Sequence, residues 1–564
     1  NIKIDIEKLH LNDEKTYDLF SNGKTVGIFQ FESGGMREHL KNLQPSTLED
    51  LIAMNALYRP GPMENIPEFI NRKKGKKRIT YLNSSLEPIL KETYGIIVYQ
   101  EQVMQIASEV AGFTLAKADI MRKAMGKKKI DEMAAIKVDF VDGAIKKGFD
   151  KKKSVEIFDL VEKFAQYGFN KSHSAAYALV AYRTAWLKAH YPAEFLAATM
   201  TTEMNDTKRI VSLINEAQSL KITIIPPNIN QSKPEFSVNK KSEIVYGLAA
   251  IKNIGYKASQ LIYKQRKNDG KYNSIFSMCK SLSNGIINKK ILESLIISGA
   301  CDSLNSKRSQ MYEVIDQAIK FGQNFNNNQN QNQASLFSND DQNVIVEPKI
   351  PLISEWNKND LLAKEKEILG FYLTGDPVED YKDDIKELSI IKNNNRDSEI
   401  VRTGGIIVNK KLLYDKKNRP WAIIEISNQI VKAEVFVFSK EFEQFSDLLE
   451  KDSLIFVSGT LSTKNQDKDI LKIICNKLYA LNNIRDKITK SFNIIFDESR
   501  SKNELEEIKN IISNNKGKYP FIIHFKYGKN QFQKIKSRRY LVSNQQSLIK
   551  KLRNILGEKN VWLS

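Results

Sequence analysis

Residues 167–195 read YGFNKSHSAAYALVAYRTAWLKAHYPAEF. A glycine and a short polar loop come first, followed by an alanine-rich segment of helical periodicity that stops before Pro192. Ser172 or Ser174 is a suitable N-cap for this helix. The first-turn N–H groups of a helix have no intrahelical acceptor, so they attract anions. The stretch therefore predicts a long helix whose first turn forms a phosphate site.

Lys171 and His173 place a fixed positive charge and a titratable donor beside that helix start. The same two residues are equally ordinary as solvated cap residues, so the local sequence leaves both interpretations open. Within the helix, apolar side chains recur at helical spacing and predict a buried stripe. Its members are Ala175, Leu179, Tyr182 and Trp186.

The composition favours a polyanionic partner. The 564 residues include 87 Lys and Arg against 67 Asp and Glu, which gives a net charge of +20. Neutralising phosphates releases condensed counterions, so nucleic acid is the expected partner. No apolar run approaches the roughly 20 residues that span a bilayer, and a membrane partner is not expected. The length allows about three to five domains, and a chain that begins at Asn1 rather than Met suggests a piece of a longer protein.

The cysteines and the basic clusters give further evidence about the cellular compartment and the kind of binding surface. Three scattered cysteines predict neither a disulfide framework nor a zinc site, and they fit a reducing cytoplasm. Basic clusters occur at 72–78 (RKKGKKR) and 122–129 (RKAMGKKK) of a mostly helical region. One such cluster is ordinarily a solvated face, whereas several together predict a groove for a phosphate backbone. Arg122 and Lys123 lie in the last turn of a helix expected from Thr114 to Gly126, where their heads can reach into a cleft.

Residues 244–266, IVYGLAAIKNIGYKASQLIYKQR, have the apolar spacing of a helix-hairpin-helix. Such a hairpin aims backbone N–H groups at a DNA phosphate without reading bases. Asn253 stands where the first glycine is usual, and asparagine enters the left-handed region more easily than most residues. The predicted DNA contacts here are Lys252, Asn253, Gly255 and Lys257. A second, weaker hairpin is expected at 295–301 (LIISGAC), with an ordinary αα-turn as the alternative in both places.

Residues 323–333, QNFNNNQNQNQ, are a low-complexity tract that is expected to form a flexible tether. The tract leads into QASLF at 333–337. Two adjacent large apolar residues at the end of a tether predict a docking peptide, with Gln333, Leu336 and Phe337 as its contacts. A chance pair of apolar residues is the alternative.

From Ile400 to Leu481 the apolar period is two. Three strands, a helix and two further strands are expected in this stretch, which is the order of an OB-fold: 401–408, 421–427, 430–438, helix 441–449, 454–461 and 470–481. Basic and aromatic residues in the first connection suit single-stranded nucleic acid, and Lys410, Lys411 and Arg419 are its predicted contacts. Phe436 or Phe438 is a candidate stacking platform, with core packing as the alternative. Residues 492–564 predict a small α/β interaction domain of strand, helix, two strands, helix and strand.

Five motifs together closely resemble the alpha subunit of bacterial DNA polymerase III, in that family's order and spacing. They are GIFQFES (27–33), ALYRPGPM (56–63), TYGIIVYQEQVMQIA (93–107), MRKAMGKKK (121–129) and YGFNKSHSAAYALVAY (167–182). The resemblance covers essentially the whole chain and implies a multi-domain fold of mainly α fingers, a helix-hairpin-helix region, a β-barrel OB-fold and a small α/β C-terminal domain. The implied boundaries are fingers 1–204, helix-hairpin-helix and clamp-binding region 205–322, tether with clamp-binding peptide 323–345, helical connector 346–395, OB-fold domain 396–482 and C-terminal interaction domain 483–564.

The resemblance also implies roles for individual residues. Arg122 and Lys123 would contact the triphosphate of an incoming dNTP, with Lys171 and His173 as neighbours of the same triphosphate. Relatives often carry a second arginine at the position of Lys123, and a lysine keeps the charge but loses the bidentate fork. QASLF is similar to the family's internal clamp-binding peptide. The implied partners are primer–template DNA, single-stranded template, the sliding clamp, clamp-loader and proofreading exonuclease subunits.

The family's chemistry needs aspartates that hold two Mg²⁺ ions, and the resemblance places them in a palm domain upstream of this chain. No catalytic or metal-binding residue is therefore assigned within the chain, and the chain alone is expected to lack polymerase activity. The leading hypothesis is the C-terminal portion of a cytoplasmic replicative polymerase. Two alternatives stay open. One is a non-catalytic DNA-binding clamp adaptor. The other is the error-prone paralogue of the same family, although QASLF and the tail domain favour the replicative form over this paralogue.

Overall fold

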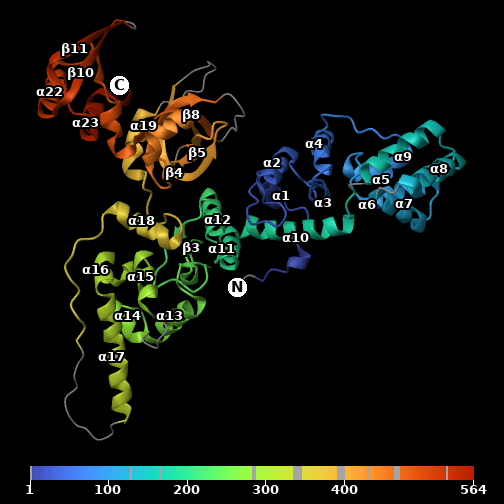
Figure 1. Cartoon of the computed structure of the whole chain (residues 1–564), viewed down its shortest axis with the longest axis horizontal. Helices are drawn as coiled ribbons and strands as arrows, with labels where there is room; N and C mark the ends of the chain where they lie inside the picture. The colour runs from blue at the N-terminus through green and yellow to red at the C-terminus, as the bar shows by residue number, and fades with distance from the viewer. Residues whose placement is uncertain are drawn as a thin grey trace. The chain divides into compact units, whose positions relative to one another are not determined.

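The chain forms two compact units, Asn1–Leu373 and Thr374–Ser564 (Figure 1). The computed structural model describes residues 3–127, 130–165, 168–282, 287–334, 346–389, 400–428, 431–462, 470–528 and 531–564. The first unit is mainly helical, and its buried apolar side chains gather into three cores among the described residues. The second unit contains a closed barrel and a mixed sheet.

The first core lies between helices that begin with side-chain caps. It is built by α1 (Glu14–Ser21), α2 (Gly34–Leu43), α3 (Leu48–Leu57), α4 (Ile66–Lys73) and α10 (Lys171–His190). Asp13, Ser33 and Thr47 each accept an N–H of the first turn of α1, α2 and α3, which satisfies a donor that the helix cannot. The second core is built by α5 (Glu87–Leu90), α6 (Gln100–Ala111), α7 (Leu115–Lys127), α8 (Ile130–Lys146) and α9 (Lys151–Ala165).

Helix α10 forms where a helix was predicted, but it begins earlier, at Lys171, and is capped and packed differently. Its N-cap is Asn170, whose side chain accepts the His173 N–H at 2.8 Å. The prediction of Ser172 or Ser174 as cap is wrong, because Ser174 is buried and donates to the Ile52 carbonyl at 2.7 Å. Of the predicted stripe only Tyr182 is fully buried. The face against α3 is instead lined mainly by small residues, which let two helices lie close: Ser174, Ala178, Ala181 and Ala185.

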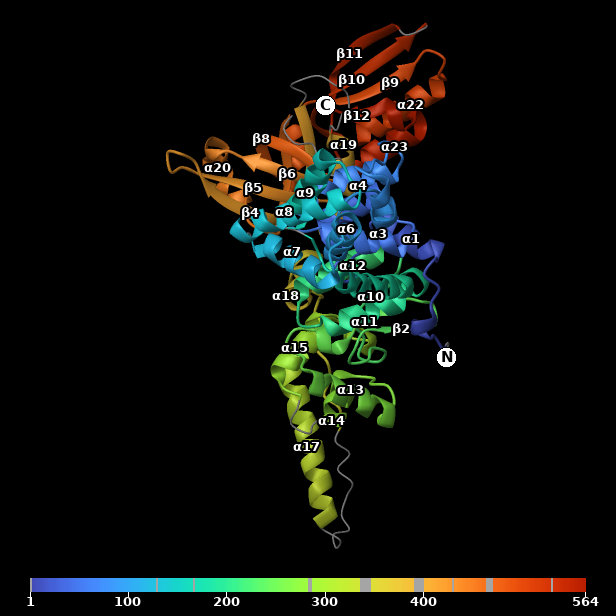
Figure 2. The same ribbon diagram turned by 90° about the vertical axis from the view of Figure 1, so that its right-hand side faces the viewer.

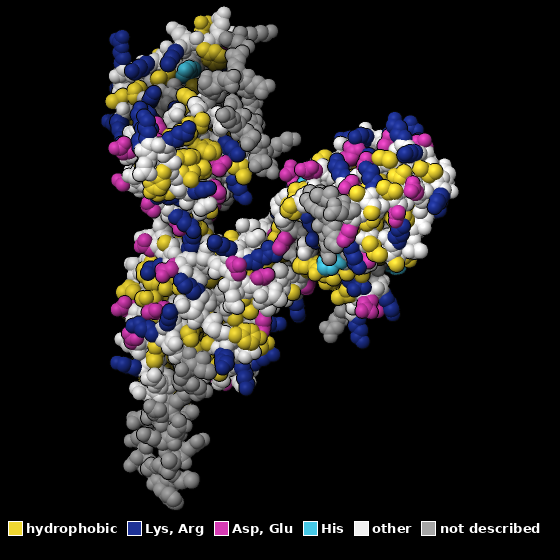
Figure 3. All heavy atoms as spheres, turned by 45° about the vertical axis from the view of Figure 1, so that its right-hand side comes forward, with side chains coloured by type: hydrophobic (Ala, Val, Ile, Leu, Met, Phe, Trp, Pro, Cys, Tyr) yellow, Lys and Arg dark blue, Asp and Glu magenta, His cyan; other side chains and the backbone are white. Residues whose placement is uncertain are grey.

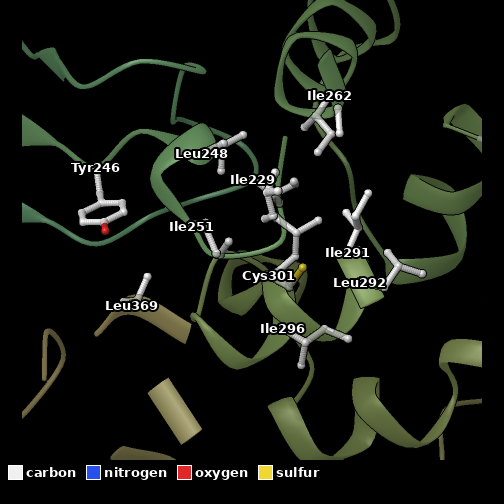
Figure 4. Close-up of a cluster of buried hydrophobic side chains, with 14 of the residues drawn as sticks. Ile229, Tyr246, Leu248, Ile251, Ile262, Ile291, Leu292, Ile296, Cys301 and Leu369 are labelled. Carbon is white, nitrogen blue, oxygen red and sulfur yellow. The ribbon is translucent and has the colours of Figure 1, made fainter. Parts of the chain in front are cut away.

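The third core spans the predicted boundary at residue 204. It joins α11 (Pro192–Thr202) and α12 (Thr207–Ser219) to α13 (Tyr256–Asp269), α14 (Ile275–Ser281), α15 (Lys289–Ile297), α16 (Arg308–Glu313) and α18 (Lys358–Leu369). A three-stranded sheet of order β1 (Ile224–Ile225), β3 (Ile244–Val245) and β2 (Ser237–Val238) lies beside them. Figure 4 shows Leu292 of α15, Leu369 of α18 and Ile251, which precedes α13 in the chain, around one core.

The helix-hairpin-helix turn adopts the predicted backbone. Asn253 has a φ of 70°, so its expected entry into the left-handed region is confirmed. Gly255 is the N-cap of α13 and supplies no side-chain acceptor to the first turn. The segment before the turn is only a short 3-10 helix, Leu248–Ala250. The second expected hairpin, 295–301, is a largely buried turn after α15, so it offers little surface to DNA.

The polar tract expected to be a tether is helical as far as Ala334. Helix α17 (Ile315–Ala334) begins with apolar residues packed in the third core and continues through the Asn- and Gln-rich sequence (Figures 1 and 2). Extending an existing helix costs far less than nucleating one, so a packed first turn is enough to carry the tract. Residues 335–345 lie outside the described part of the chain.

The barrel of the second unit confirms the predicted order of strands and helix. It closes as β4 (Ile400–Tyr414), β5 (Pro420–Ser427), β6 (Lys432–Val437), β8 (Leu471–Ala480) and β7 (Leu454–Leu461), with α20 (Ser439–Phe445) between β6 and β7. This is the connectivity of an OB-fold. β4 is longer than predicted, so Lys410, Lys411 and Tyr414 lie on the strand and only 415–419 form the loop. The Asp415 carboxylate accepts the N–H groups of Lys417 and Arg419 and closes this tight turn.

The C-terminal domain also has the predicted order of elements. They are β9 (Phe492–Asp497), α22 (Lys502–Asn514), β10 (Lys516–Tyr527), β11 (Gln531–Val542), α23 (Gln546–Leu556) and β12 (Val561–Leu563), in a sheet of order β11-β10-β9-β12. An ion-pair cluster ties this domain to helix α19 (Lys382–Leu388), which also packs on the barrel. Arg485, on α21 (Ile484–Ile488), lies 2.5 Å from Asp384 and 3.0 Å from Glu387, and Arg553 lies 2.8 Å from Glu387.

One fully buried lysine joins three segments of the first unit. Lys188 of α10 donates to the carbonyls of Lys24 and Val26 at 2.7 and 2.8 Å and to Glu216 of α12 at 2.6 Å. Burial lowers the pKa of Lys188, and the carboxylate of Glu216 opposes that shift. All three ammonium donors therefore have acceptors, which is the condition for a charge to be tolerated in a core.

Replacing Lys188 by Met should loosen the packing of α10 on α12. Glu216, whose side chain is 7% exposed, would be left as an unpaired buried carboxylate, which costs about 3–5 kcal/mol. Hydrogen exchange of the α10 and α12 amides measures the loss. The double variant Lys188→Met/Glu216→Leu should recover most of the protection, and exposed Lys208→Met on α12 is the matched control. Unchanged exchange in the single variant would contradict the role given to this pair.

Candidate nucleotide site and nucleic-acid interfaces

The loop before α10 is held by a short backbone pairing with the segment before α6. Tyr99 and Phe169 form a parallel bridge. The Gln100 N–H donates to the Phe169 carbonyl at 3.0 Å, and the Phe169 N–H donates to the Val98 carbonyl at 3.1 Å. The N-termini of α6 and α10 are thereby fixed side by side, although about 70 residues separate them in the chain.

Gln100 extends this pairing to the predicted triphosphate residue of α7. Its side-chain oxygen accepts from Arg122 at 3.0 Å, and its amide nitrogen donates to the Gly168 carbonyl at 2.9 Å. The structure therefore brings Arg122 to the loop that carries Lys171 and His173. Lys123 points its ammonium to Asp119 at 2.6 Å and remains 58% exposed. Arg122 shares the same carboxylate, through Nε at 3.0 Å and Nη2 at 2.7 Å.

A carboxylate already occupies the predicted anion site at the start of α10. Glu101 accepts the Lys171 N–H at 2.9 Å and the Asn170 side-chain amide at 3.0 Å. The Lys171 ammonium lies 2.7 Å from Glu92. These contacts are what an anion makes at a helix N-terminus. The first turn of α10 thus holds a carboxylate of the same chain, and a phosphate contact there stays a prediction.

His173 belongs to a ladder of rings along α10. Its ring lies 5.4 Å from Phe169 and 4.4 Å from Tyr177, and Tyr177 stacks on Phe29 at 5.2 Å. The Arg59 guanidinium lies 3.8 Å from the centroid of Phe169, which places a further cation at the same loop. Sequence reasoning missed Arg59, Glu92 and Glu101. All three lie in or beside the motifs ALYRPGPM and TYGIIVYQEQVMQIA, but nothing in the sequence showed that they meet.

A cavity of about 410 Å³ lies beside this cluster, with Glu92, Glu101, Gln102 and Lys171 among its lining residues. Arg122, Lys123 and Lys171 are paired with carboxylates, whereas Arg59 lies against the Phe169 ring. Hydrogen bonds from Lys123 and then Arg122 lower the pKa of Asp119. In Figure 3 basic side chains on the visible face of the first unit are interspersed with acidic ones. An anion that binds to the three paired cations must therefore replace these carboxylates.

The predicted helix-hairpin-helix contacts lie at the surface. Lys252 and Lys257 are exposed, and Gly255 leaves the α13 first turn without a side-chain cap. The Lys252 N–H donates to the Ile368 carbonyl at 3.4 Å, and the Asn253 side chain donates to Ser294 at 3.1 Å. Asn253 therefore shapes the turn, while the first turn of α13 and the two lysines face outward. A phosphate contact at these residues remains a prediction.

The barrel presents rings and cations near the turn between β4 and β5. Trp421 lies 5.6 Å from Phe438, which is 45% exposed, and Tyr414 is 61% exposed. Phe436 is half-buried on the same outer face as Phe438. Lys410 is paired with Glu450 at 3.0 Å and Arg419 with Asp415 at 2.8 Å, whereas Lys411 is exposed. Trp421 is the ring that sequence reasoning did not single out.

Two further expectations concern docking and metal. Leu336 and Phe337 of the QASLF peptide lie outside the described residues, and Gln333 is on the last turn of α17. The described residues contain no group of three or more His, Cys, Asp or Glu side chains placed to hold a metal ion. Within the same residues no helix is long and apolar enough to cross a membrane.

Helical modules, a helix-hairpin-helix turn and an OB-like barrel with exposed rings define a multi-domain protein suited to nucleic acid. Residues 1–148 match the model of the bacterial DNA polymerase III alpha subunit finger domain, and residues 221–311 match a helix-hairpin-helix motif. Curated proteins named DNA polymerase III subunit alpha align over 99% of the chain. Identity is 39% for Buchnera aphidicola, 40% for Borreliella burgdorferi and 35% for Escherichia coli K12.

The chain belongs to the family of bacterial DNA polymerase III alpha subunits. It spans about half the length of these relatives, with 49% of the Buchnera protein and 50% of the Escherichia protein covered.

Neutralising Glu92 should strengthen anion binding at the start of α10. Glu92→Gln frees the Lys171 ammonium from a competing carboxylate, so pyrophosphate should bind this chain about three- to tenfold more tightly. Isothermal titration with pyrophosphate is the measurement. Glu38→Gln, the same charge change on an exposed residue of α2, is the matched control. The gain in affinity should vanish in Glu92→Gln/Lys171→Gln. An equal gain in the Glu38 variant would show that the effect comes from the overall charge of the protein and not from the release of Lys171.

Proposed function

We propose that this chain is the C-terminal portion of the replicative DNA polymerase III alpha subunit, a DNA-directed DNA polymerase that extends primers from dNTPs in the bacterial cytoplasm. Similarity over 99% of the chain supports the family. The observation that carries the nucleotide role is the convergence of Arg122 and the start of α10 on Gln100 and Glu101.

Arg122 and Lys171 act by exchanging carboxylates for phosphate oxygens. The Arg122 guanidinium, now on Asp119, offers the fork that fits a phosphate bidentately, whereas Lys123 offers a single point charge. The Lys171 ammonium turns from Glu92 toward the same triphosphate. The Lys171 backbone N–H, which now donates to Glu101, becomes free to donate to an anion. Because the competing carboxylates remain nearby, weakly charged ligands gain little from the exchange, while a triphosphate gains several ion contacts at once.

The remaining modules hold the nucleic acid. Lys252, Lys257 and the first turn of α13 are proposed to contact phosphates of the primer–template duplex. Lys411, Arg419 and the rings around Trp421 are proposed to bind the single-stranded template by charge and stacking. If Lys410 left its ion pair with Glu450, it would become a further cation for binding the template.

Chemistry of this kind uses two Mg²⁺ ions that activate the primer hydroxyl and stabilise the leaving pyrophosphate. We propose that the ligands of these ions belong to the half of the family protein that this chain does not cover. The chain alone is accordingly expected to leave a primer unextended. The proposed partners are the sliding clamp at Gln333, Leu336 and Phe337, and clamp-loader and proofreading exonuclease subunits.

Arg122→Ala in the full-length protein should raise the KM for dNTP about tenfold or more in primer extension, because it removes a charge-assisted phosphate contact. Lys117→Ala is the matched control, since Lys117 is on the same helix but pairs with exposed Asp139 at 2.7 Å. Steady-state extension with varied dNTP measures the effect. A KM that does not change, or that rises equally in both variants, would remove Arg122 from the nucleotide site.

Leu336→Ala/Phe337→Ala should abolish clamp-dependent processivity while sparing distributive synthesis. The two side chains are proposed to fill pockets on the clamp, and removing both loses the anchors. Product lengths with and without clamp measure this. Leu352→Ala/Ile353→Ala, a pair of partly to fully exposed apolar residues further along the chain, is the control. Long clamp-dependent products from the Leu336/Phe337 variant would disprove the tether assignment.

A further inference from the structure

The C-terminal sheet has one face covered by helices, and no described helix packs on its other face. Apolar residues of α22 and α23 pack in one core with Phe492, Ile494 and Phe496 of β9. Successive residues of a strand point to opposite faces, so the residues between these point away from both helices. We call this second surface the open sheet face. It comprises His524, Lys526, Phe532, Lys534, Lys536 and Trp562.

The strand register gathers these residues on one surface. In the antiparallel pair β10–β11, His524 lies opposite Lys534, Lys526 opposite Phe532, and Ile522 opposite Lys536. Directly opposite residues of such a pair share a face. Across β9, Trp562 of β12 lies opposite Asn493, and Asn493 lies beside Ile522 of β10. Four strands thus contribute side chains to one continuous surface.

The open sheet face presents aromatic rings. The His524 ring lies against Trp562 with ring centroids 5.0 Å apart and planes tilted by 37°, and its Nε2 lies 3.1 Å from the side-chain oxygen of Asn493. Asn493 is itself buried and donates to Ser491 and Ser564, which fixes the floor beneath the ring pair. Phe532 is 50% exposed. A large apolar ring left half in water on a well-formed sheet is a candidate contact surface.

The charge around these rings is mainly positive. Residues 508–557 contain twelve lysines and arginines and no aspartate or glutamate. Lys526 pairs with Asp497 at 3.1 Å, whereas Lys534 and Lys536 form no ion pair within the described residues. Burial, and after it the charge of Lys534, lowers the pKa of His524, so its ring remains neutral at physiological pH. The surface therefore combines free cations with uncharged rings.

We propose that the open sheet face binds single-stranded nucleic acid, with bases stacked on Phe532 and on the His524–Trp562 pair and phosphates beside Lys534 and Lys536. Exposed rings on a four-stranded sheet are a known solution for stacking bases, and lysines at strand spacing follow the backbone. An acidic peptide would satisfy the lysines but leave the ring faces in water. The surface is distinct from the rings near Trp421 on the barrel and does not depend on primer extension.

Photocrosslinking on the full 564-residue chain tests the proposal. A twelve-residue oligothymidylate carrying 5-iodouracil should form adducts in peptides that contain Phe532 and Trp562, identified by mass spectrometry. Lys534→Glu/Lys536→Glu should lower the yield of these adducts about tenfold, with adducts at Trp421 unchanged. Phe532→Ala should lower the yield without altering its salt dependence. Lys509→Glu/Lys551→Glu makes the same charge change on exposed residues of α22 and α23 and should leave all adducts unchanged.

Three outcomes would overturn the proposal. Adducts confined to the barrel would show that the face does not contact the strand. An equal loss in both charge-reversal pairs would reduce the effect to net charge. Binding of a hepta-glutamate peptide that is lost in Lys534→Glu/Lys536→Glu, without nucleotide adducts at Phe532 or Trp562, would assign the face to an acidic protein partner. Because the readout is binding alone, each outcome is independent of polymerase activity.

Discussion

The backbone pairing of residues 98–100 with 168–169 is the constraint on which the proposed nucleotide site depends. Two hydrogen bonds, Phe169 N–H to Val98 and Gln100 N–H to Phe169, set the α10 start beside the α6 start. Gln100 then reaches Arg122 of α7, and Glu101 reaches the first turn of α10. Without this pairing, the cations on α7 and α10 would belong to separate cores, since α7 packs in the second core and α10 in the first.

The electrostatics of the first unit follow from internal pairing rather than from the net charge of +20. Arg122, Lys123 and Lys171 each contact a carboxylate at 2.6–2.7 Å. Such partly exposed pairs contribute little to stability, but they hold long side chains near one geometry. Asp119, Glu92 and Glu101 thus occupy the positions that the proposed function gives to phosphate oxygens. Lys188 differs from these partly exposed cations because it is fully buried. Its charge is tolerated only because Glu216 and two carbonyls accept its hydrogen bonds.

The second unit joins its two domains through charges and presents rings on both. Arg485 and Arg553 both form ion pairs with Glu387 of α19. This helix, which precedes the barrel in the sequence, is therefore also bonded to the C-terminal domain. The barrel rings at Trp421 and Phe438 and the sheet rings at Trp562 and Phe532 all lie outside the cores. Large aromatic side chains left outside two well-packed cores are more readily explained by contacts than by folding.

Local patterning was enough to predict the barrel's strand order, the C-terminal element order, the left-handed Asn253 and the extent of α7, because periodicity and turn chemistry are properties of short segments. The motifs likewise identified the family. The cap of α10, its buried stripe and the length of α17 required tertiary contacts: Ser174 is drawn to Ile52, and small residues face α3. Only the fold decided that Glu101 fills the predicted anion site and that Arg59 joins it, because contacts between residues tens of positions apart leave no local periodicity.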